Sequence, residues 1–139
     1  LTPPAVASEQ DDGVLTASEV AGMKLDADWA LLSACNTAAA DGKPGAEGLS
    51  GLAKAFAFAG ARSLVVSHWS VISDSTVALN SKMFHTYTST KATKSEAQRQ
   101  AMLNLINSSN GKFAHPTYWA PFVIVGDGGE VGRKASARK

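Results

Sequence analysis

The sequence is poor in cysteine: Cys35 is the single one in 139 residues. One cysteine excludes an internal disulfide and a zinc site built from several thiolates, and it favours a reducing compartment such as the cytoplasm. The chain also lacks the run of about 18 apolar residues that a membrane-spanning helix requires. The glycines between Gly42 and Gly51 lack the spacing and the Lys-Ser/Thr pair of a phosphate-binding loop. The sequence therefore predicts no membrane span, no metal and no cofactor.

Charged residues make up only 18% of the chain and are unevenly spread. Four of the thirteen basic residues lie in the last seven positions, which leaves nine basic and twelve acidic residues over 1–132. This body has no basic stripe with interleaved aromatic residues, so we expect no nucleic-acid binding. Residues 129–139 are predicted to form a disordered basic tail, with contact to nucleic acid or anionic lipid as the alternative.

The composition divides the chain into three parts. Pro3, Pro4 and the acidic run at 9–13 predict an extended connector over residues 1–13. Residues 14–128 have the size and the apolar content of one compact domain. With the basic tail, this gives a single domain between two irregular ends.

Apolar periodicity predicts the order helix, strand, helix, strand, helix, helix, strand. Strands that alternate with helices indicate an α/β fold with right-handed crossovers and a mostly parallel sheet. Three strands are few for such a sheet, so we expect further strands before Leu1 and regard the chain as the C-terminal part of a domain. The predicted elements are a helix at 16–22, a strand at 29–34, a helix at 47–59, a strand at 63–69, a helix at 73–87, a helix at 95–107 and a strand at 120–126.

Local signals support several of these helices. Thr16 and Glu19 have the spacing of a capping box, and Gly60 stands where a C-terminal glycine cap belongs. In the helix at 73–87, one face is expected to carry Val77, Asn80, Phe84 and Tyr87, with Met83 beside them.

Chemically useful side chains follow the strands. In open parallel sheets, ligands gather beyond the carboxyl ends of the strands. The three predicted strands end at Cys35-Asn36, His68-Trp69 and Gly126-Asp127. A thiol, an imidazole and a carboxylate are therefore predicted at one edge of the sheet. The alternative is that Cys35 is a small buried apolar residue.

Each neighbouring candidate has two interpretations. His68 is either a general base for Cys35 or a residue that lines a pocket. Asp74 is either a pocket carboxylate for a basic side chain or, like Ser73, the cap of the helix that begins there. Trp69 and Trp119 form either an aromatic pocket wall or part of the core. The two other histidines, His85 and His115, are expected to be structural.

The segment Leu32-Ser-Ala-Cys-Asn-Thr37 resembles the nucleophile motif of CHAT domains, which are caspase-like peptidase domains commonly found behind TPR repeats in bacteria. Further segments are similar to that family in order and spacing, over roughly residues 12–128. The resemblance implies a caspase-like α/β fold and thiol-dependent peptide hydrolysis. The supporting segments are 12–22, 47–63, 65–74 and 115–127.

The resemblance also assigns roles. It implies that Cys35 is the nucleophile and that its backbone N–H belongs to the oxyanion hole. The general base of the family is a histidine followed by glycine at the end of the preceding strand. No His-Gly pair occurs in residues 1–139, so this base is expected upstream of Leu1. Four residues would then line the substrate site: Asn36, His68, Trp69 and Asp74.

The resulting prediction is a cysteine endopeptidase domain from a bacterial TPR-containing protein, which cuts a peptide or protein substrate and uses no cofactor. Asn36 and Ser70 depart from residues that relatives often have there, Glu and Pro, although neither touches the proposed chemistry. The alternative is an inactive caspase-like module for protein–protein interaction. Half a sheet would expose an apolar strand edge, which predicts either a dimer or association with an N-terminal piece.

Overall fold

The structure is a computed structural model that describes residues 15–32, 51–107 and 111–129. The predicted connector and most of the predicted tail lie outside these ranges, so the predicted division of the chain stays a prediction. No helix in the described ranges is long and apolar enough to cross a membrane. The elements follow the predicted order: α1 (Ala17–Gly22), β1 (Ala30–Leu31), α2 (Gly51–Phe58), β2 (Ser63–Ser67), α3 (Ser73–Thr90), α4 (Lys94–Asn107), the 3-10 helix η2 (Pro116–Tyr118) and β3 (Phe122–Gly126).

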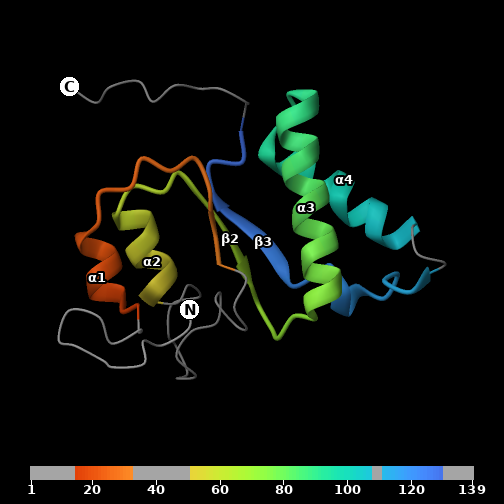
Figure 1. The fold of residues 1–139 in the computed structure, drawn as a ribbon, viewed down its shortest axis with the longest axis horizontal. Helices are drawn as coiled ribbons and strands as arrows, with labels where there is room; N and C mark the ends of the chain where they lie inside the picture. The colour runs from red at the N-terminus through yellow and green to blue at the C-terminus, as the bar shows by residue number, and fades with distance from the viewer. Residues whose placement is uncertain (1–14, 33–50, 108–110, 130–139) are drawn as a thin grey trace, which may run out of the picture.

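Two pairs of helices enclose a three-stranded sheet (Figure 1). The helices α1 and α2 lie on one side of the strands, and α3 and α4 lie on the other. Every residue of β2 is buried, because β2 is the central strand of the order β1-β2-β3. Leu64 and Val66 pack on the α2 side, whereas Val65 packs with α3 and α4. The α/β fold class predicted from the sequence is confirmed.

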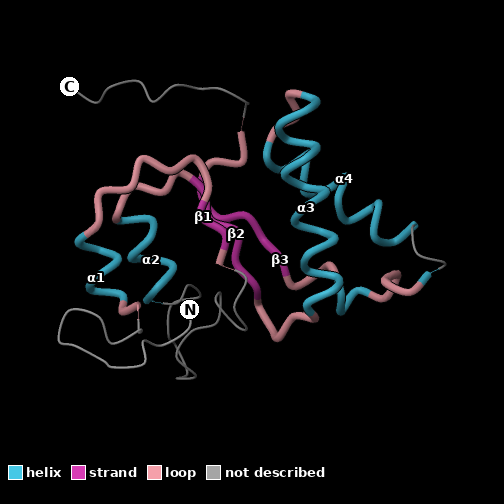
Figure 2. The backbone as a smooth tube through the Cα atoms, viewed as in Figure 1, coloured by secondary structure: helices cyan, strands magenta, loops and turns pink. Residues whose placement is uncertain are grey.

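The sheet is mixed, which corrects one expectation (Figure 2). β1 pairs with β2 in parallel, with Ala30 opposite Leu64, but β3 pairs with β2 in antiparallel, with Ser63 opposite Gly126. A single helix between two strands returns the chain to the end at which the first strand began, so that the second strand runs parallel to it. Between β2 and β3 the chain instead forms two packed helices, α3 and α4, so it arrives at β3 from the end where β2 stops. The expectation that the three strands end at one edge of the sheet, which requires β3 to be parallel, is therefore wrong for β3.

Both local helix signals are confirmed. The Glu19 N–H donates to Thr16 Oγ1 (3.3 Å) and the Thr16 N–H donates to Glu19 Oε2 (2.7 Å), which completes the capping box at α1. Gly60 follows α2 with φ +107°, and a Cβ there would collide with the carbonyl oxygen of Leu25. Glycine is therefore required at the turn that brings α2 back to the sheet.

The buried face of α3 differs from the predicted one at its first turns. Val77 is 64% exposed, whereas Ser75, Thr76 and Leu79 are buried. Two of these side chains are polar, but Ser75 Oγ and Thr76 Oγ1 both donate to the carbonyl oxygen of Ile72. Their hydroxyls are satisfied locally, so they can occupy the buried positions.

Candidate functional site

The sequence predicts a site at the end of the sheet where β1 and β2 stop. Cys35 and Asn36 lie outside the described residues, so their positions stay predictions. The approach to them is described: the Leu32 N–H donates to the Val65 carbonyl oxygen (2.8 Å), which extends the parallel pairing past β1. The chain therefore leaves β1 toward the edge of the sheet at which β2 also ends.

His68 lies at this edge. It directly follows β2, and its backbone N–H donates to the Pro121 carbonyl oxygen (3.0 Å). The residue is exposed, and its imidazole forms no hydrogen bond or ion pair with any residue of the described ranges. A general base is normally oriented by a hydrogen bond to its second ring nitrogen. In the described part of the chain His68 has no such partner.

The two tryptophans near this edge have different environments. Trp69 is 41% exposed, and its Nε1 donates to the Thr117 carbonyl oxygen at 3.4 Å. Trp119 packs against the core between the sheet and α3–α4, and its Nε1 donates to the Ala114 carbonyl oxygen at 3.2 Å. Trp69 therefore offers ring surface at the edge, and Trp119 belongs to the core.

Asp74 does not cap α3. The N-cap residue is Ile72, which has no side-chain cap bond, so the expectation that Ser73 or Asp74 caps the helix is wrong. Asp74 instead lies in the first turn of α3, where a negative charge interacts favourably with the helix dipole. Its side chain is 75% exposed, and the nearest cation is Lys112 Nζ at 3.7 Å. An ion pair this exposed binds weakly, so the carboxylate is accessible to a ligand.

The predicted third member of the site lies elsewhere. Asp127 follows β3, and because β3 is antiparallel, its carboxyl end lies at the start of β2. The Asp127 N–H donates to the Arg62 carbonyl oxygen (3.0 Å), one residue before β2. The carboxylate expected beside His68 is therefore at the opposite end of the sheet, and Pro121 lies beside His68 instead.

Of the other two histidines, His115 has a structural contact, and for His85 the expected structural role stays a prediction. His115 Nδ1 accepts from the Thr117 N–H (3.2 Å) and so caps the 3-10 helix η2. His85 is exposed on α3. In the described ranges, no group of three or more His, Cys, Asp or Glu side chains is arranged to hold a metal ion.

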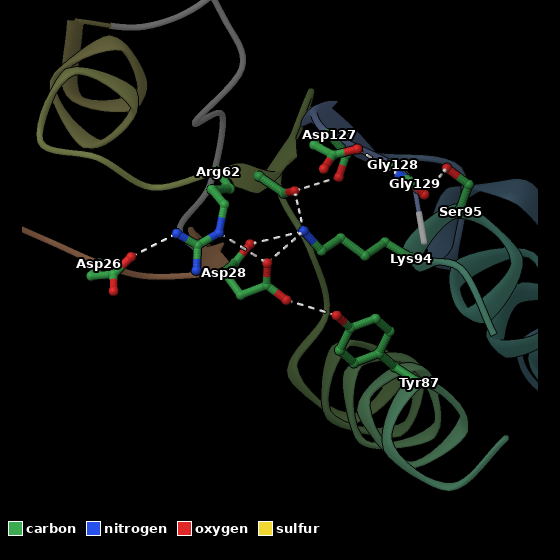
Figure 3. Close-up of polar contacts among 10 residues, drawn as sticks. Asp26, Asp28, Arg62, Tyr87, Lys94, Ser95, Asp127, Gly128 and Gly129 are labelled. Atoms are coloured by element: carbon green, nitrogen blue, oxygen red, sulfur yellow. Dashed lines mark hydrogen bonds and ion pairs between the residues drawn. The ribbon is translucent and has the colours of Figure 1, made fainter. Parts of the chain in front are cut away.

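A buried lysine organises the opposite end of the sheet (Figure 3). Lys94, the first residue of α4, is 2% exposed. Its Nζ donates to the carbonyl oxygen of Asp28 (3.1 Å), to Asp28 Oδ1 (3.1 Å) and to Ser63 Oγ (2.8 Å). The Tyr87 hydroxyl donates to Asp28 Oδ2 (2.7 Å), and Arg62 Nε donates to Asp28 Oδ1 (3.3 Å).

These contacts shift the pKa values of Asp28 and Tyr87. The Tyr87 hydrogen bond, followed by those from Lys94 and Arg62, lowers the pKa of the Asp28 carboxyl below its ordinary value, although partial burial opposes this. Burial and donation to Asp28 raise the pKa of Tyr87. At neutral pH a charged Asp28 thus holds together β2, α3 and α4, so this network is structural. Sequence reasoning missed it, because no spacing rule connects residues so far apart in the chain.

Comparison with known proteins identifies the family. The family model of the CHAT domain matches residues 4–127. The chain belongs to the CHAT domain family. This is a caspase-like family, in agreement with the resemblance noted from the sequence. No solved structure gives a significant match.

Two curated relatives of the chain are mammalian. Tetratricopeptide repeat protein 28 from mouse and the human protein of the same name are each 30% identical to the chain over 115 residues. Each match covers 81% of this chain but 4% of the relative. Their names agree with the expected association with TPR repeats. Because they are mouse and human proteins, they do not support the expected bacterial origin, which stays a prediction.

Proposed function

We propose that this chain is the nucleophile-bearing part of a CHAT cysteine endopeptidase within a TPR-containing polypeptide of a reducing, cytoplasmic compartment. The observation that carries the proposal is the parallel pairing of β1 with β2. This pairing directs the residues after Leu32 toward the edge of the sheet at which His68 and Trp69 lie. Such an edge is where α/β sheets collect ligands and reacting groups.

The proposed chemistry is acyl transfer to a thiol. The thiolate of Cys35 attacks the carbonyl carbon of a peptide bond, and its backbone N–H contributes to stabilising the oxyanion that forms. A histidine supplied by polypeptide outside this chain takes the thiol proton and passes it to the departing amine. Water then hydrolyses the thioester and regenerates Cys35. His68 is not assigned this role, because no described residue orients its imidazole.

The side chains at the edge would recognise the substrate. Trp69 offers a half-exposed aromatic surface, and the exposed carboxylate of Asp74 suits a basic side chain. His68 and Asn36 would complete the wall of the pocket. The proposed substrate is therefore a peptide or an exposed protein segment.

Alkylation of the intact, full-length protein tests the proposal. An activated Cys35 should react with iodoacetamide near pH 7 much faster than a free thiol, because a paired cysteine has a lowered pKa and is largely thiolate. The Cys35→Ala variant reports labelling at any other cysteine of the intact protein. Labelling of Cys35 at or below the rate of the free thiol would contradict an activated nucleophile.

The second candidate is an inactive caspase-like module that binds a peptide or a partner protein. It is favoured by the absence of an oriented general base from the described residues. It predicts that Cys35→Ala leaves every readout of the intact protein unchanged, whereas Trp69→Ala weakens partner binding. Cleavage of a substrate that depends on Cys35 would rule it out.

A further inference from the structure

A lysine from the segment before η2 reaches the first turn of α3. This lysine, Lys112, lies in a short turn that the Ala114 N–H closes by donating to the Gly111 carbonyl oxygen (3.1 Å). Phe113, in the same turn, is buried, and its ring stacks edge-on against Tyr118 with the centroids 5.3 Å apart. The backbone of Lys112 is therefore held by a closed turn and by the buried ring of its neighbour.

The same segment borders the candidate site. Trp69, two residues after the end of β2, donates from its Nε1 to the Thr117 carbonyl oxygen of η2 (3.4 Å). Lys112 Nζ lies 3.7 Å from Asp74 Oδ2 in the first turn of α3. Residues 111–118 thus contact two of the residues that are proposed to bind substrate, Trp69 and Asp74.

The ammonium group of Lys112 lies between a carboxylate and an aromatic ring. Its Nζ is 3.7 Å from Asp74 Oδ2 and 4.8 Å from the centroid of the Phe113 ring. Carboxylates and aromatic faces are the groups with which proteins bind alkylammonium ligands. Lys112 therefore occupies the place at Asp74 that the charged end of a basic substrate side chain would take.

A ligand can displace this lysine. The distance of 3.7 Å is longer than a hydrogen bond, and the side chains of Lys112 and Asp74 are 64% and 75% exposed. No described residue donates a hydrogen bond to the Asp74 carboxylate, so both of its oxygens can accept from a ligand. Lys112 offsets part of the charge of Asp74 without using its hydrogen-bonding capacity.

Exposed apolar side chains flank Asp74. Ile72 precedes it as the N-cap of α3, and Val77 lies three residues after it on the same face of the helix. Ile72 is 51% exposed and Val77 is 64% exposed. A lysine or an arginine carries its charge at the end of an apolar stem, which such a surface can contact. The surroundings of Asp74 therefore suit a long basic side chain.

We propose that Lys112 is a specificity-determining residue, which competes with a basic side chain of the substrate for Asp74. It thereby lowers the preference of the site for lysine and arginine over uncharged residues. The inference rests on the proposed function, because Asp74 must take part in substrate binding, but it does not require that the bound peptide is cut. An exposed ion pair changes an equilibrium by up to about fivefold, which sets the size of the expected effect.

Binding of two matched peptides to the intact, full-length protein that carries Cys35→Ala tests the proposal. One fluorescent, capped peptide contains a single lysine, and the other contains norleucine in its place, which has a similar apolar stem and no charge. Fluorescence anisotropy gives the dissociation constant of each peptide, and the ratio of the two constants measures the preference for positive charge. Lys112→Met should raise this preference by up to about fivefold. Lys112→Arg keeps the charge and should leave the preference near its original value.

Two controls separate competition at Asp74 from a general effect of charge. Lys24→Met removes the same charge from an exposed lysine that follows α1, on the other side of the sheet, and should leave the preference unchanged. In an Asp74→Asn background, Lys112→Met should no longer alter the preference, because the carboxylate for which the two cations compete is gone. Equal preferences in Lys112→Met and Lys24→Met overturn the proposal, as does a rise that persists in the Asp74→Asn background. Failure of the lysine peptide to bind Lys112→Met at millimolar concentration also overturns it.

The outcomes also separate this inference from the proposed function. A raised preference in Lys112→Met, without any cleavage that depends on Cys35, rejects the endopeptidase and leaves the role of Lys112 in place. Cleavage that depends on Cys35, with equal preferences in Lys112→Met and Lys24→Met, supports the endopeptidase and overturns the role of Lys112.

Discussion

Lys94 shows how a single polar side chain can be buried with its donors satisfied. Three oxygen atoms surround its ammonium group, and the Trp29 ring centroid lies 5.7 Å away. Each contact replaces part of the hydration that burial removes. This buried network lies at the end of the sheet opposite the candidate site, where it links Asp28 to β2 and α4.

Replacement of Lys94 measures what this network contributes. Lys94→Met keeps the length of the apolar stem but leaves Ser63 and Asp28 without their shared donor, so the free energy of unfolding should fall by about 1–3 kcal/mol. Urea denaturation gives the value. Lys112→Met removes an exposed lysine from the pair with Asp74, and the change there should stay below about 1 kcal/mol. Equal effects would show that the buried network adds nothing.

The network also predicts how the free energy of unfolding changes at low pH. The folded protein lowers the pKa of Asp28, so the unfolded chain takes up its proton first as the pH falls. The stability from this carboxylate is complete above the ordinary value of 3.8 and is lost as the pH drops toward the lower folded pKa. Asp28→Asn should therefore flatten the fall in unfolding free energy below about pH 4.

Glu96 is the control for that measurement. Its hydrogen bond with Arg99 lowers its pKa to about 2, so it titrates in the same window. Glu96→Gln should also reduce the slope of unfolding free energy against pH, but it should leave the contribution of Asp28 to that slope unchanged. An Asp28→Asn variant whose slope below pH 4 equals that of the unsubstituted protein would contradict the assignment.

At the scale of elements, two glycines around α2 provide a matched test. Gly60→Ala forces a positive φ on a residue with a Cβ and drives that atom into the Leu25 carbonyl, so we expect a loss of about 1–3 kcal/mol in unfolding free energy. Gly51→Ala, at the start of α2, meets open space and should cause no loss. Thermal unfolding of the two variants compares them directly, and equal melting temperatures would exclude a special role for Gly60.

The elements also show what the sequence could predict. The capping box and the Gly60 turn are local, so they were predictable from residues a few positions apart. The direction of β3 depends on how α3 and α4 pack, which no single segment encodes, and Asp127 was misplaced as a consequence. His68 and Trp69 directly follow β2, as the apolar pattern of that strand predicts, while their part in a substrate site stays a prediction.

At the scale of the whole molecule, the chain and its parent polypeptide should behave differently. The proposed base lies outside residues 1–139, so Cys35 of the isolated chain should react with iodoacetamide no faster than a free thiol, whereas Cys35 of the intact protein should react faster. Rates of alkylation followed by mass spectrometry check this. Fast labelling of the isolated chain would show that its own residues, His68 included, suffice to activate the thiol.

Arg62 joins both outer strands at one end of the sheet. Its N–H donates to the Ala27 carbonyl oxygen, and its own carbonyl accepts from the Asp127 N–H. A force that separates residue 27 from residue 127 would act on both outer strands at the same end of β2. The hydrogen bonds between the strands would then break one after another, beginning at Arg62, and would not all bear the load at once. The hydrogen bonds nearest the candidate site, at the other end of β2, would thus break last.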